Sequence, residues 1–268
     1  MQAEYPSNDI EAFAKTGHNV FDLSQLALLR STCRAPLEKG DIEADYKTVR
    51  RVHFVPQRDG LLHIWRHPER DSRAVAWRYL VSCDVGGRGD KADWSVIAVW
   101  DRHDGRSERP EIVAQWRGHL DHDLLAWKAA QIAAYYGNAL LVIESNTLET
   151  EQGRIDAGTY ILNEVSLQYA HLYRRGTRRS GFQTNRRTKR DAIYRLVGAV
   201  RDLTYVERSH DAVDEMSWFE QLPNDRFGAV KGRHDDIVMT RAIGLAVLAE
   251  LSPVSHPAPP PESLSFSF

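Results

Sequence analysis

Short runs of β-branched and aromatic residues, interrupted by turns and by one long amphipathic stretch, constrain the fold of this chain most strongly. Three runs cover residues 79–85, 94–100 and 111–117, with Gly-, Asp- and Pro-containing turns between them. Apolar residues at helical spacing then cover Asp121–Tyr136 and end at Gly137, a typical helix C-cap. A fourth run covers residues 139–144. Because a long helix allows a crossover connection, the pattern predicts three antiparallel strands and a fourth strand that returns into the same sheet.

Weaker patterns predict the remaining elements. We expect a hairpin around the Asp59-Gly60 turn and a fifth strand at residues 169–174. Helices are expected at residues 22–30, 155–165, 190–202, 211–221 and 235–251, with a short extended LTYV segment at 203–206. The result is an α/β fold with a central mixed five-stranded sheet flanked by helices. Residues 1–75 are expected to form an approach or linker segment, residues 76–251 one domain, and the Pro- and Ser-rich residues 252–268 a flexible tail.

The composition excludes several classes of protein. With 42% hydrophobic and 27% charged residues, the chain fits neither a membrane protein nor a wholly disordered one. It has no run of about 18 apolar residues and no signal-peptide pattern, so we expect a cytoplasmic protein that does not contact membranes. Cys33 and Cys83 are too few for a disulfide framework and lack zinc-site spacing.

Acidic residues stand at the ends of three predicted elements. Asp84 closes the first strand, Glu144 closes the fourth, and His234-Asp235-Asp236 opens the last helix. If the first and fourth strands are neighbours, their carboxyl ends lie side by side, and the helix brings a third acid to them. Clustered carboxylates raise one another's pKa values unless a cation lies between them. Hard oxygen ligands favour Mg²⁺ or Mn²⁺, and two such ions would support hydrolysis of a phosphodiester.

Each acid also has a purely structural explanation. Asp84 precedes Gly86-Gly87 and could be a turn residue that hydrogen-bonds its own backbone. Glu144 could pair with an Arg in the core. Asp235 or Asp236 could cap the last helix, because Asp is a favoured N-cap residue and suits the helix dipole. The joint occurrence of all three acids at one sheet edge is what favours a metal site.

A basic segment at residues 174–190 could bind nucleic acid, although the formal net charge of −2 gives no global attraction to it. The segment contains no acid and interleaves Phe182 with basic side chains. The basic residues that we expect to contact phosphates are Arg178, Arg179, Arg186, Arg187 and Lys189. Such contacts give affinity with little base preference and a steep dependence on salt. A solvated charged loop is the alternative.

Four stretches together resemble the nuclease domain of the large terminase subunit of tailed phages. They are CDVGGRGDKADWSVIAVW, LLVIESN, SGFQTNRRTKRDAIYRL and GRHDDIVMTRAIGLAV, and the resemblance covers about Tyr79–Ala249. The opening EYPSNDIEAFAKTGHNVFD also resembles the segment that joins the packaging ATPase to the nuclease in that family, and DGLLHIWRHP resembles the hairpin before its first nuclease strand. The family has a ribonuclease H-like fold, which we therefore expect here.

The resemblance implies a largely sequence-nonspecific DNA endonuclease that cuts concatemeric viral DNA during packaging in the host cytoplasm. It implies two Mg²⁺ or Mn²⁺ ions held by Asp84, Glu144 and the Asp235/Asp236 pair, with Asp236 favoured as the direct ligand. Asp93 stands where the family often has an acid and would hold a metal-bound water, or is a solvated turn residue. His234 would orient a phosphate or a carboxylate, or is a polar residue flanking the helix.

The implied partners are double-stranded DNA, the packaging ATPase, the portal and the small terminase. The sequence has no Gly-x-x-x-x-Gly-Lys-Ser/Thr phosphate loop, so we expect either an excised nuclease or a natural fragment of a longer protein. It also departs from the family after Glu144, where Glu149 and Glu151 add acids. The alternatives are another ribonuclease H-like nuclease, such as a junction resolvase or a cutter of RNA:DNA hybrids, and a catalytically silent DNA-binding packaging module.

Overall fold

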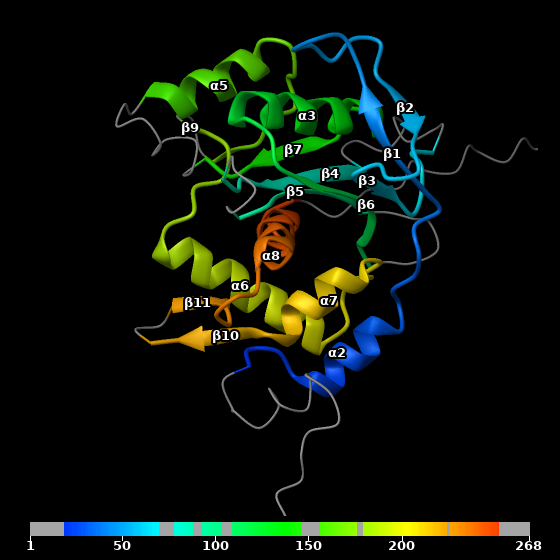
Figure 1. Ribbon diagram of the computed structural model, residues 1–268. Coiled ribbons are helices and arrows are strands. Elements are labelled where there is room, and N and C mark those ends of the chain that lie inside the picture. Colours follow the sequence, from blue (N-terminus) through cyan, green and yellow to red (C-terminus); the bar gives the residue numbers. More distant parts are fainter. Residues whose placement is uncertain are drawn as a thin grey trace, which may run out of the picture.

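Residues 19–69, 78–87, 93–102, 109–145, 156–175, 179–223 and 226–251 are described by a computed structural model of the chain. They contain a seven-stranded sheet with helices on both faces (Figure 1). The strand order across the sheet is β2-β1-β3-β6-β5-β4-β7. The strands are β1 (Glu38–Glu43), β2 (His53–Pro56), β3 (Leu62–Ile64), β4 (Tyr79–Asp84), β5 (Ser95–Asp101), β6 (Glu111–Gly118) and β7 (Leu140–Ile143). Neighbours in this sheet are antiparallel except for β4 and β7, which are parallel.

The helices form a layer on each face of the sheet. Helices α3 (His122–Tyr135) and α5 (Asp156–Ser166) lie on one side (Figure 1). Helices α8 (Asp236–Leu248) and α6 (Arg186–Arg201) lie on the other, with α7 (His210–Ser217) and α2 (Leu23–Arg30) beside them. Short strands complete the structure: β8 (Arg174–Arg175) pairs with β9 (Arg179–Ser180), and β10 (Phe219–Leu222) pairs with β11 (Arg226–Ala229). No helix among these residues is long and apolar enough to cross a membrane.

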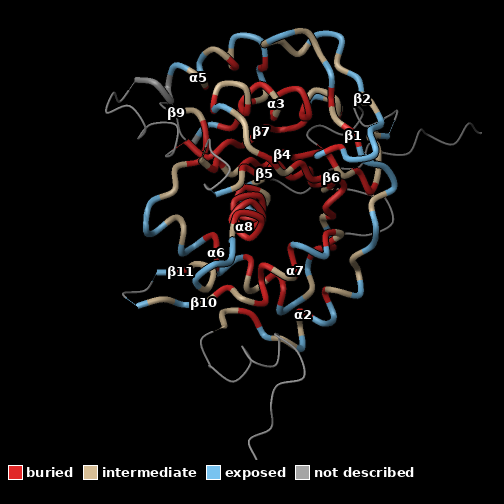
Figure 2. Tube along the Cα trace, in the orientation of Figure 1, coloured by how far each residue is buried: buried red, intermediate tan, exposed pale blue. Residues whose placement is uncertain are grey.

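Successive side chains along β4 and β5 point to opposite faces of the sheet and pack into two different apolar clusters. Leu80 and Trp100 pack with residues of α6 and α8, whereas Val81 and Val99 pack with residues of α3. Helix α8 lies between the sheet and α6 and is buried along nearly its whole length (Figure 2). A helix with apolar residues on nearly every side requires such a position, and its buried Thr240 and Arg241 find polar partners there. The amino end of α8 is thereby held against the sheet.

The predicted order of the central elements is confirmed. β4, β5 and β6 are antiparallel neighbours, α3 provides the crossover, and β7 returns parallel to β4. Gly137 follows α3 with a φ of 73°, a left-handed conformation that glycine adopts without steric cost. The predicted helices also form: α2, α3, α5 and α8 agree with the predicted ends to within three residues, whereas α6 begins four residues early and α7 ends four residues early. The mixed α/β sheet flanked by helices therefore follows from the sequence pattern.

The sheet has seven strands instead of the predicted five, for two reasons. β1, β2 and β3 continue the same sheet beyond β6. The predicted fifth strand at 169–174 instead touches β7 through a single parallel bridge, Leu141 to Leu172, and only its last residue enters β8. The division of the chain at residue 75 stays a prediction, although β1–β3 share a sheet with the later strands. Residues 1–18 and 252–268, at its two ends, lie outside the described residues.

Two local predictions are wrong. The Asp59-Gly60 turn does not close a hairpin, because β1 lies between β2 and β3 and pairs with both. A Cβ at Gly60 would lie 2.4 Å from the Gly40 Cα, so the backbones come too close there for a side chain. The predicted helix at 211–221 ends at Ser217, and the β10–β11 hairpin follows it. The LTYV segment contributes only an isolated bridge between Val206 and Glu111.

Candidate active site

Asp84 and Glu144 end two adjacent parallel strands. The last paired residues of β4 and β7 are Cys83 and Ile143, and the Glu144 backbone N–H donates to the Cys83 carbonyl at 2.9 Å. Cys83 and Ile143 belong to the core beneath α3, so the residues that follow them turn to the other face. Ser82, two residues before Asp84, already donates its hydroxyl to the Thr240 carbonyl of α8. Asp84 and Glu144 therefore lie at the sheet edge on the side of α8 and α6.

The amino end of α8 brings Asp235 and Asp236 to this edge. The Asp235 side chain forms no capping hydrogen bond. Glu215 of α7 caps the helix instead, because its Oε2 accepts from the backbone N–H groups of Ile237 at 2.8 Å and Val238 at 3.4 Å. Asp236 Oδ2 accepts from the Trp94 N–H at 3.2 Å. Capping, the structural alternative for these two acids, is thus performed by another residue.

Electrostatic coupling links the four acids. Burial raises the pKa of Asp84 well above its ordinary value, and the charges of Glu144, Asp236 and Asp235 raise it further. Burial is also the main reason that the pKa of Asp236 is raised to about 6. The hydrogen bond from the Trp94 backbone N–H acts in the opposite direction and lowers this pKa. For Asp235, burial raises the pKa and the charge of Lys189 opposes it. Three elements therefore place partly desolvated carboxylates within electrostatic reach of one another, an arrangement that a cation would stabilise.

The donor set fits a hard divalent cation. All four candidate ligands are carboxylates, and Mg²⁺ in proteins is typically bound by one or two carboxylates while it keeps several waters and takes phosphate oxygens. Within the described ranges, no group of three or more His, Cys, Asp or Glu side chains is placed to hold one ion. Asp84, Glu144, Asp235 and Asp236 supply only the oxygen donors that such an ion prefers, and waters and substrate oxygens would complete its coordination.

Asp93 and His234 lie beside Asp236. His234 Nδ1 is 3.7 Å from Asp236 Oδ2 and 4.0 Å from Asp93 Oδ1. The Asp93 side chain is 80% exposed, yet its charge raises the pKa values of both Asp235 and Asp236. A Cβ at Gly86 would lie 2.3 Å from the Asp93 carbonyl oxygen, so the glycine lets the ends of the first two predicted strands approach closely. The structure brings both predicted residues to the cluster.

The basic residues divide into two groups. Arg186 and Arg187 are exposed on the first turn of α6 instead of a loop, after Asn185, which caps the helix. Lys189 is half-buried, and its charge lowers the pKa values of Asp84 and Asp235. Lys189 therefore faces the acids, whereas the two arginines face solvent. Arg178, Glu149 and Glu151 lie outside the described residues, as does the Arg179 side chain.

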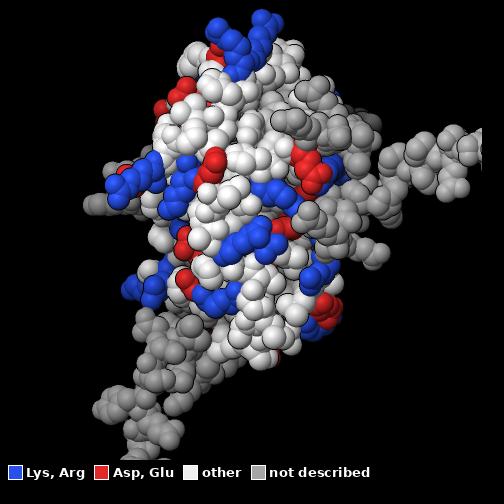
Figure 3. Space-filling view, turned by 90° about the vertical axis from the view of Figure 1, so that its right-hand side faces the viewer, with Lys and Arg blue, Asp and Glu red and all other residues white. Residues whose placement is uncertain are grey.

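Phe182 is not available to stack on nucleic acid. It is buried, and its backbone pairs with the end of β7: Phe182 N–H donates to Ile143 at 2.8 Å, and Ser145 N–H donates to Phe182 at 3.0 Å. Its interleaving with basic residues in the sequence was therefore misleading. On the face that lies to the right in Figure 1, Lys and Arg are interspersed with Asp and Glu and form no surface of a single sign (Figure 3).

Sequence reasoning missed two residues next to the acids, Glu215 and Arg117. Arg117 Nη2 lies 3.2 Å from Glu215 Oε1 and 3.9 Å from Asp236 Oδ2. In the sequence, Glu215 has the pattern of an ordinary polar residue on an amphipathic helix. Arg117 has the pattern of an ordinary residue at the end of a strand. Only the packing of α7 and β6 against the amino end of α8 shows their relation to the acids.

Comparison with known proteins identifies the fold. No family model matches the chain, and no curated protein matches it significantly. Solved structures do. The large terminase nuclease of the thermophilic phage G20c, solved with bound magnesium, superposes with a TM-score of 0.57 over 86% of this chain and 98% of the other, at 18% identity. The chain has the fold of a large terminase nuclease.

Two further structures of the G20c terminase nuclease agree. The form with bound cobalt gives a TM-score of 0.54 over 86% of this chain, and another structure gives 0.53 over 85%, both at 18% identity and covering 98% of the terminase nuclease. The predicted ribonuclease H-like fold is confirmed. The similarity also extends over nearly the whole of the solved terminase nuclease.

Proposed function

We propose that the chain is a divalent-metal-dependent DNA endonuclease that cuts concatemeric viral DNA during genome packaging. The observation that carries this proposal is that Asp84 and Glu144 follow the last paired residues of two adjacent parallel strands, on the sheet face that α8 covers, in a chain with the fold of a terminase nuclease. The G20c nuclease has been solved with bound magnesium. The oxygen-only donor set of this chain suits the same class of ion, with Mg²⁺ or Mn²⁺ as the proposed cofactor.

In this proposal Asp84, Glu144 and Asp236 are the catalytic carboxylates. Asp235 and Asp93 complete the ligand set directly or through water. Two bound ions would supply a nucleophilic water and stabilise the departing oxygen of the phosphodiester. Lys189 balances part of the negative charge of Asp84 and Asp235. His234, close to Asp236 and Asp93, orients the phosphate or a carboxylate.

Double-stranded DNA is the proposed substrate. Arg186 and Arg187 at the exposed start of α6, together with Arg178 and Arg179, would neutralise backbone phosphates. Because such contacts do not read bases, cleavage is expected to be largely sequence-nonspecific. In the packaging reaction, the partners would be the ATPase, the portal and the small terminase, in the cytoplasm of a bacterial host.

Plasmid cleavage tests the proposal. The wild-type protein should cut supercoiled plasmid with Mg²⁺ or Mn²⁺ and should be inactive with EDTA. Asp84→Asn and Glu144→Gln should each lower the rate by at least about 100-fold, because each removes a proposed metal ligand. Asp59→Asn, which changes an exposed turn acid far along the chain, is the matched control and should cut like the wild type.

Other outcomes would favour the alternatives. Faster cutting of four-way junctions or RNA:DNA hybrids than of duplex DNA would favour another ribonuclease H-like nuclease. If Mn²⁺ neither supports cleavage nor raises the melting temperature, the chain is a silent DNA-binding module. Equal cleavage by Asp84→Asn, Glu144→Gln and the wild type would reject the proposed site.

A further inference from the structure

Arg117, at the end of β6, lies between two nearly buried carboxylates. Its Nη2 is 3.2 Å from Glu215 Oε1 and 3.9 Å from Asp236 Oδ2. The Glu215 side chain is 3% exposed and that of Asp236 6%, whereas that of Arg117 is 26% exposed. The guanidinium also lies 5.2 Å from the centroid of the Trp94 ring. The backbone N–H of Trp94 donates to Asp236. The Arg117 guanidinium therefore lies near both carboxylates, and Glu215 is the nearer of the two.

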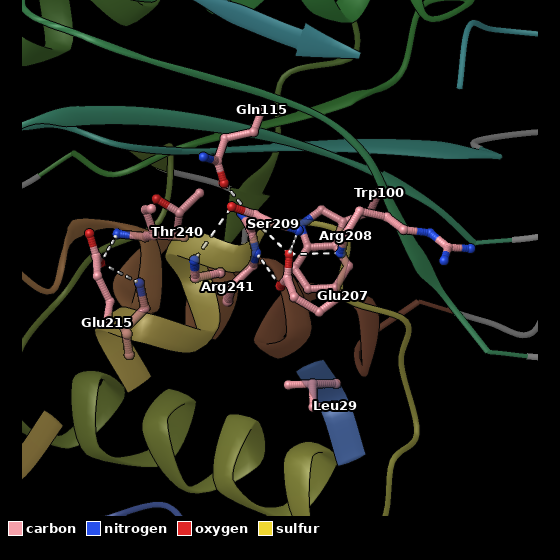
Figure 4. A network of polar contacts seen from close by, with 12 residues as sticks. Leu29, Trp100, Gln115, Glu207, Arg208, Ser209, Glu215, Thr240 and Arg241 are labelled. Atoms are coloured by element: carbon pink, nitrogen blue, oxygen red, sulfur yellow. Dashed lines mark hydrogen bonds and ion pairs between the residues drawn. The ribbon is translucent and has the colours of Figure 1, made fainter. Parts of the chain in front are cut away.

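The two carboxylate oxygens of Glu215 have different neighbours. Glu215 Oε2 accepts from the Ile237 and Val238 N–H groups at the start of α8 (Figure 4), which leaves Oε1 toward Arg117. Neither Glu215 Oε1 nor Arg117 Nε has a hydrogen-bond partner among the described residues. The contact between Arg117 Nη2 and Glu215 Oε1 is thus an ion pair without hydrogen-bond geometry, and it depends on the negative charge of Glu215.

The alternative partner of Arg117 is Asp236, a proposed metal ligand. A guanidinium paired with a carboxylate occupies the oxygen lone pairs that a metal would need. His234 Nδ1 also lies 3.7 Å from Asp236 Oδ2, the same carboxylate oxygen that Arg117 approaches. Without the negative charge of Glu215, Asp236 would be the remaining carboxylate with a short contact to Arg117 in the described structure.

We propose that Glu215 is a positioning residue that holds Arg117 away from Asp236 and so keeps the Asp236 carboxylate free for the divalent cation. This inference rests on the proposed metal-dependent function. Glu215 thereby has two roles, each performed by one oxygen: Oε2 caps α8, and Oε1 holds the competing cation.

Mn²⁺ binding in the absence of DNA, measured by titration calorimetry, separates these two roles. Glu215→Gln keeps a carbonyl oxygen to cap α8 but loses the negative charge. It should therefore bind Mn²⁺ about 10–100-fold more weakly, the usual effect of changing a residue that orients a metal ligand. Arg117→Met, which removes the competing cation, should bind Mn²⁺ at least as tightly as the wild type. The double variant should recover most of the affinity lost in Glu215→Gln.

The controls distinguish failure of this inference from failure of the proposed function. If the wild type binds no Mn²⁺, the metal-dependent function itself is contradicted. If the wild type binds Mn²⁺ and Glu215→Gln binds it equally well, or Arg117→Met fails to restore binding to Glu215→Gln, then Glu215 acts only as a cap. Thermal unfolding in EDTA establishes that each variant is folded. If Glu215→Gln does not fold, the Mn²⁺ affinity of Arg117→Met tests the inference alone. Weaker Mn²⁺ binding by Arg117→Met than by the wild type would mean that Arg117 supports metal binding and does not compete with the metal for Asp236.

Discussion

The charge of Asp236 makes the stability of the metal-free protein depend on pH. The folded pKa is raised to about 6 from an ordinary value of 3.8, chiefly by burial. An acid with a raised folded pKa contributes stability that is complete below about 3.8 and is lost as the pH rises through about 6. A difference of about two pKa units corresponds to about 3 kcal/mol at pH 8. Asp236→Asn should remove this loss, since the amide does not ionise.

Urea unfolding in EDTA measures this difference. At pH 8 Asp236→Asn should be more stable than the wild type by up to about 3 kcal/mol, and at pH 4 the two proteins should nearly coincide. The conservative change keeps an oxygen that can accept from the Trp94 N–H. A constant difference between the two proteins across this range would mean that Asp236 ionises in the folded state as easily as in the unfolded one.

Single residues also show where sequence reasoning succeeds and where it stops. Asp84 and Glu144 were found because each directly follows a buried apolar run, and a charge in that position calls for an explanation. Glu215 and Arg117 carry no such signal, because their local patterns are those of an ordinary helix and strand. Their roles arise only when α7 and β6 pack against α8. The proposed positioning residue is therefore harder to find in the sequence than the proposed ligands.

At the scale of elements, a glycine fixes the distance between α8 and the sheet. A Cβ on Gly244 would lie 2.3 Å from Trp100 Nε1, whereas a Cβ on Gly198 in α6 would meet nothing within 4 Å. Gly244→Ala should destabilise the protein by about 1–3 kcal/mol, because the added methyl group overpacks the contact between α8 and β5. Gly198→Ala, the matched control, should stabilise it by about 0.5–1 kcal/mol through helix propensity. Denaturant unfolding measures both effects, and a similar gain in both variants would show that α8 can move away from Trp100 freely.

The start of α6 is the element expected to hold DNA. Arg186→Ala combined with Arg187→Ala should weaken binding to duplex DNA and lower the slope of log K against log salt by about 1.8, if each arginine neutralises one phosphate. Arg50→Ala combined with Arg58→Ala removes the same charge from exposed positions near β2 and is the control. Fluorescence anisotropy at several salt concentrations gives the slopes. Equal slopes for the two double variants would assign the α6 arginines to a solvated surface.

Elements were predictable where the sequence had strong periodicity. β4 to β7, α3 and α8 have long apolar patterns, and each forms close to its predicted position. β1 reads EKGDIE, and its polar composition gives no strand signal; it forms because β2 and β3 pair with it on both sides. The missed strand then led to the wrong hairpin at Asp59-Gly60. Whether such a segment becomes a strand depends on pairing with distant parts of the chain, and the local sequence carries no information about that pairing.

At the scale of the whole molecule, a buried ion pair joins segments that are far apart in the chain. Arg241 of α8 donates to Glu207 from Nε at 2.8 Å and from Nη2 at 3.0 Å, and also to Gln115 of β6 at 2.6 Å (Figure 4). Arg241 and Glu207 are both fully buried. The Glu207 backbone carbonyl in turn accepts from the Thr32 hydroxyl, just beyond α2. The network thus ties α2 and the sheet to α8, at whose amino end Asp235 and Asp236 lie.

Breaking this pair from one side should be far more harmful than removing it completely. Arg241→Met leaves the Glu207 carboxylate buried without its cation and should destabilise the protein by about 3–5 kcal/mol. Adding Glu207→Gln to Arg241→Met removes the uncompensated charge, so the double variant should be more stable than Arg241→Met alone. Urea unfolding of the wild type, both single variants and the double variant completes the cycle. Strictly additive losses would mean that the two side chains stabilise the fold independently, through packing and separate hydrogen bonds, and that α8 is not anchored by their mutual charge.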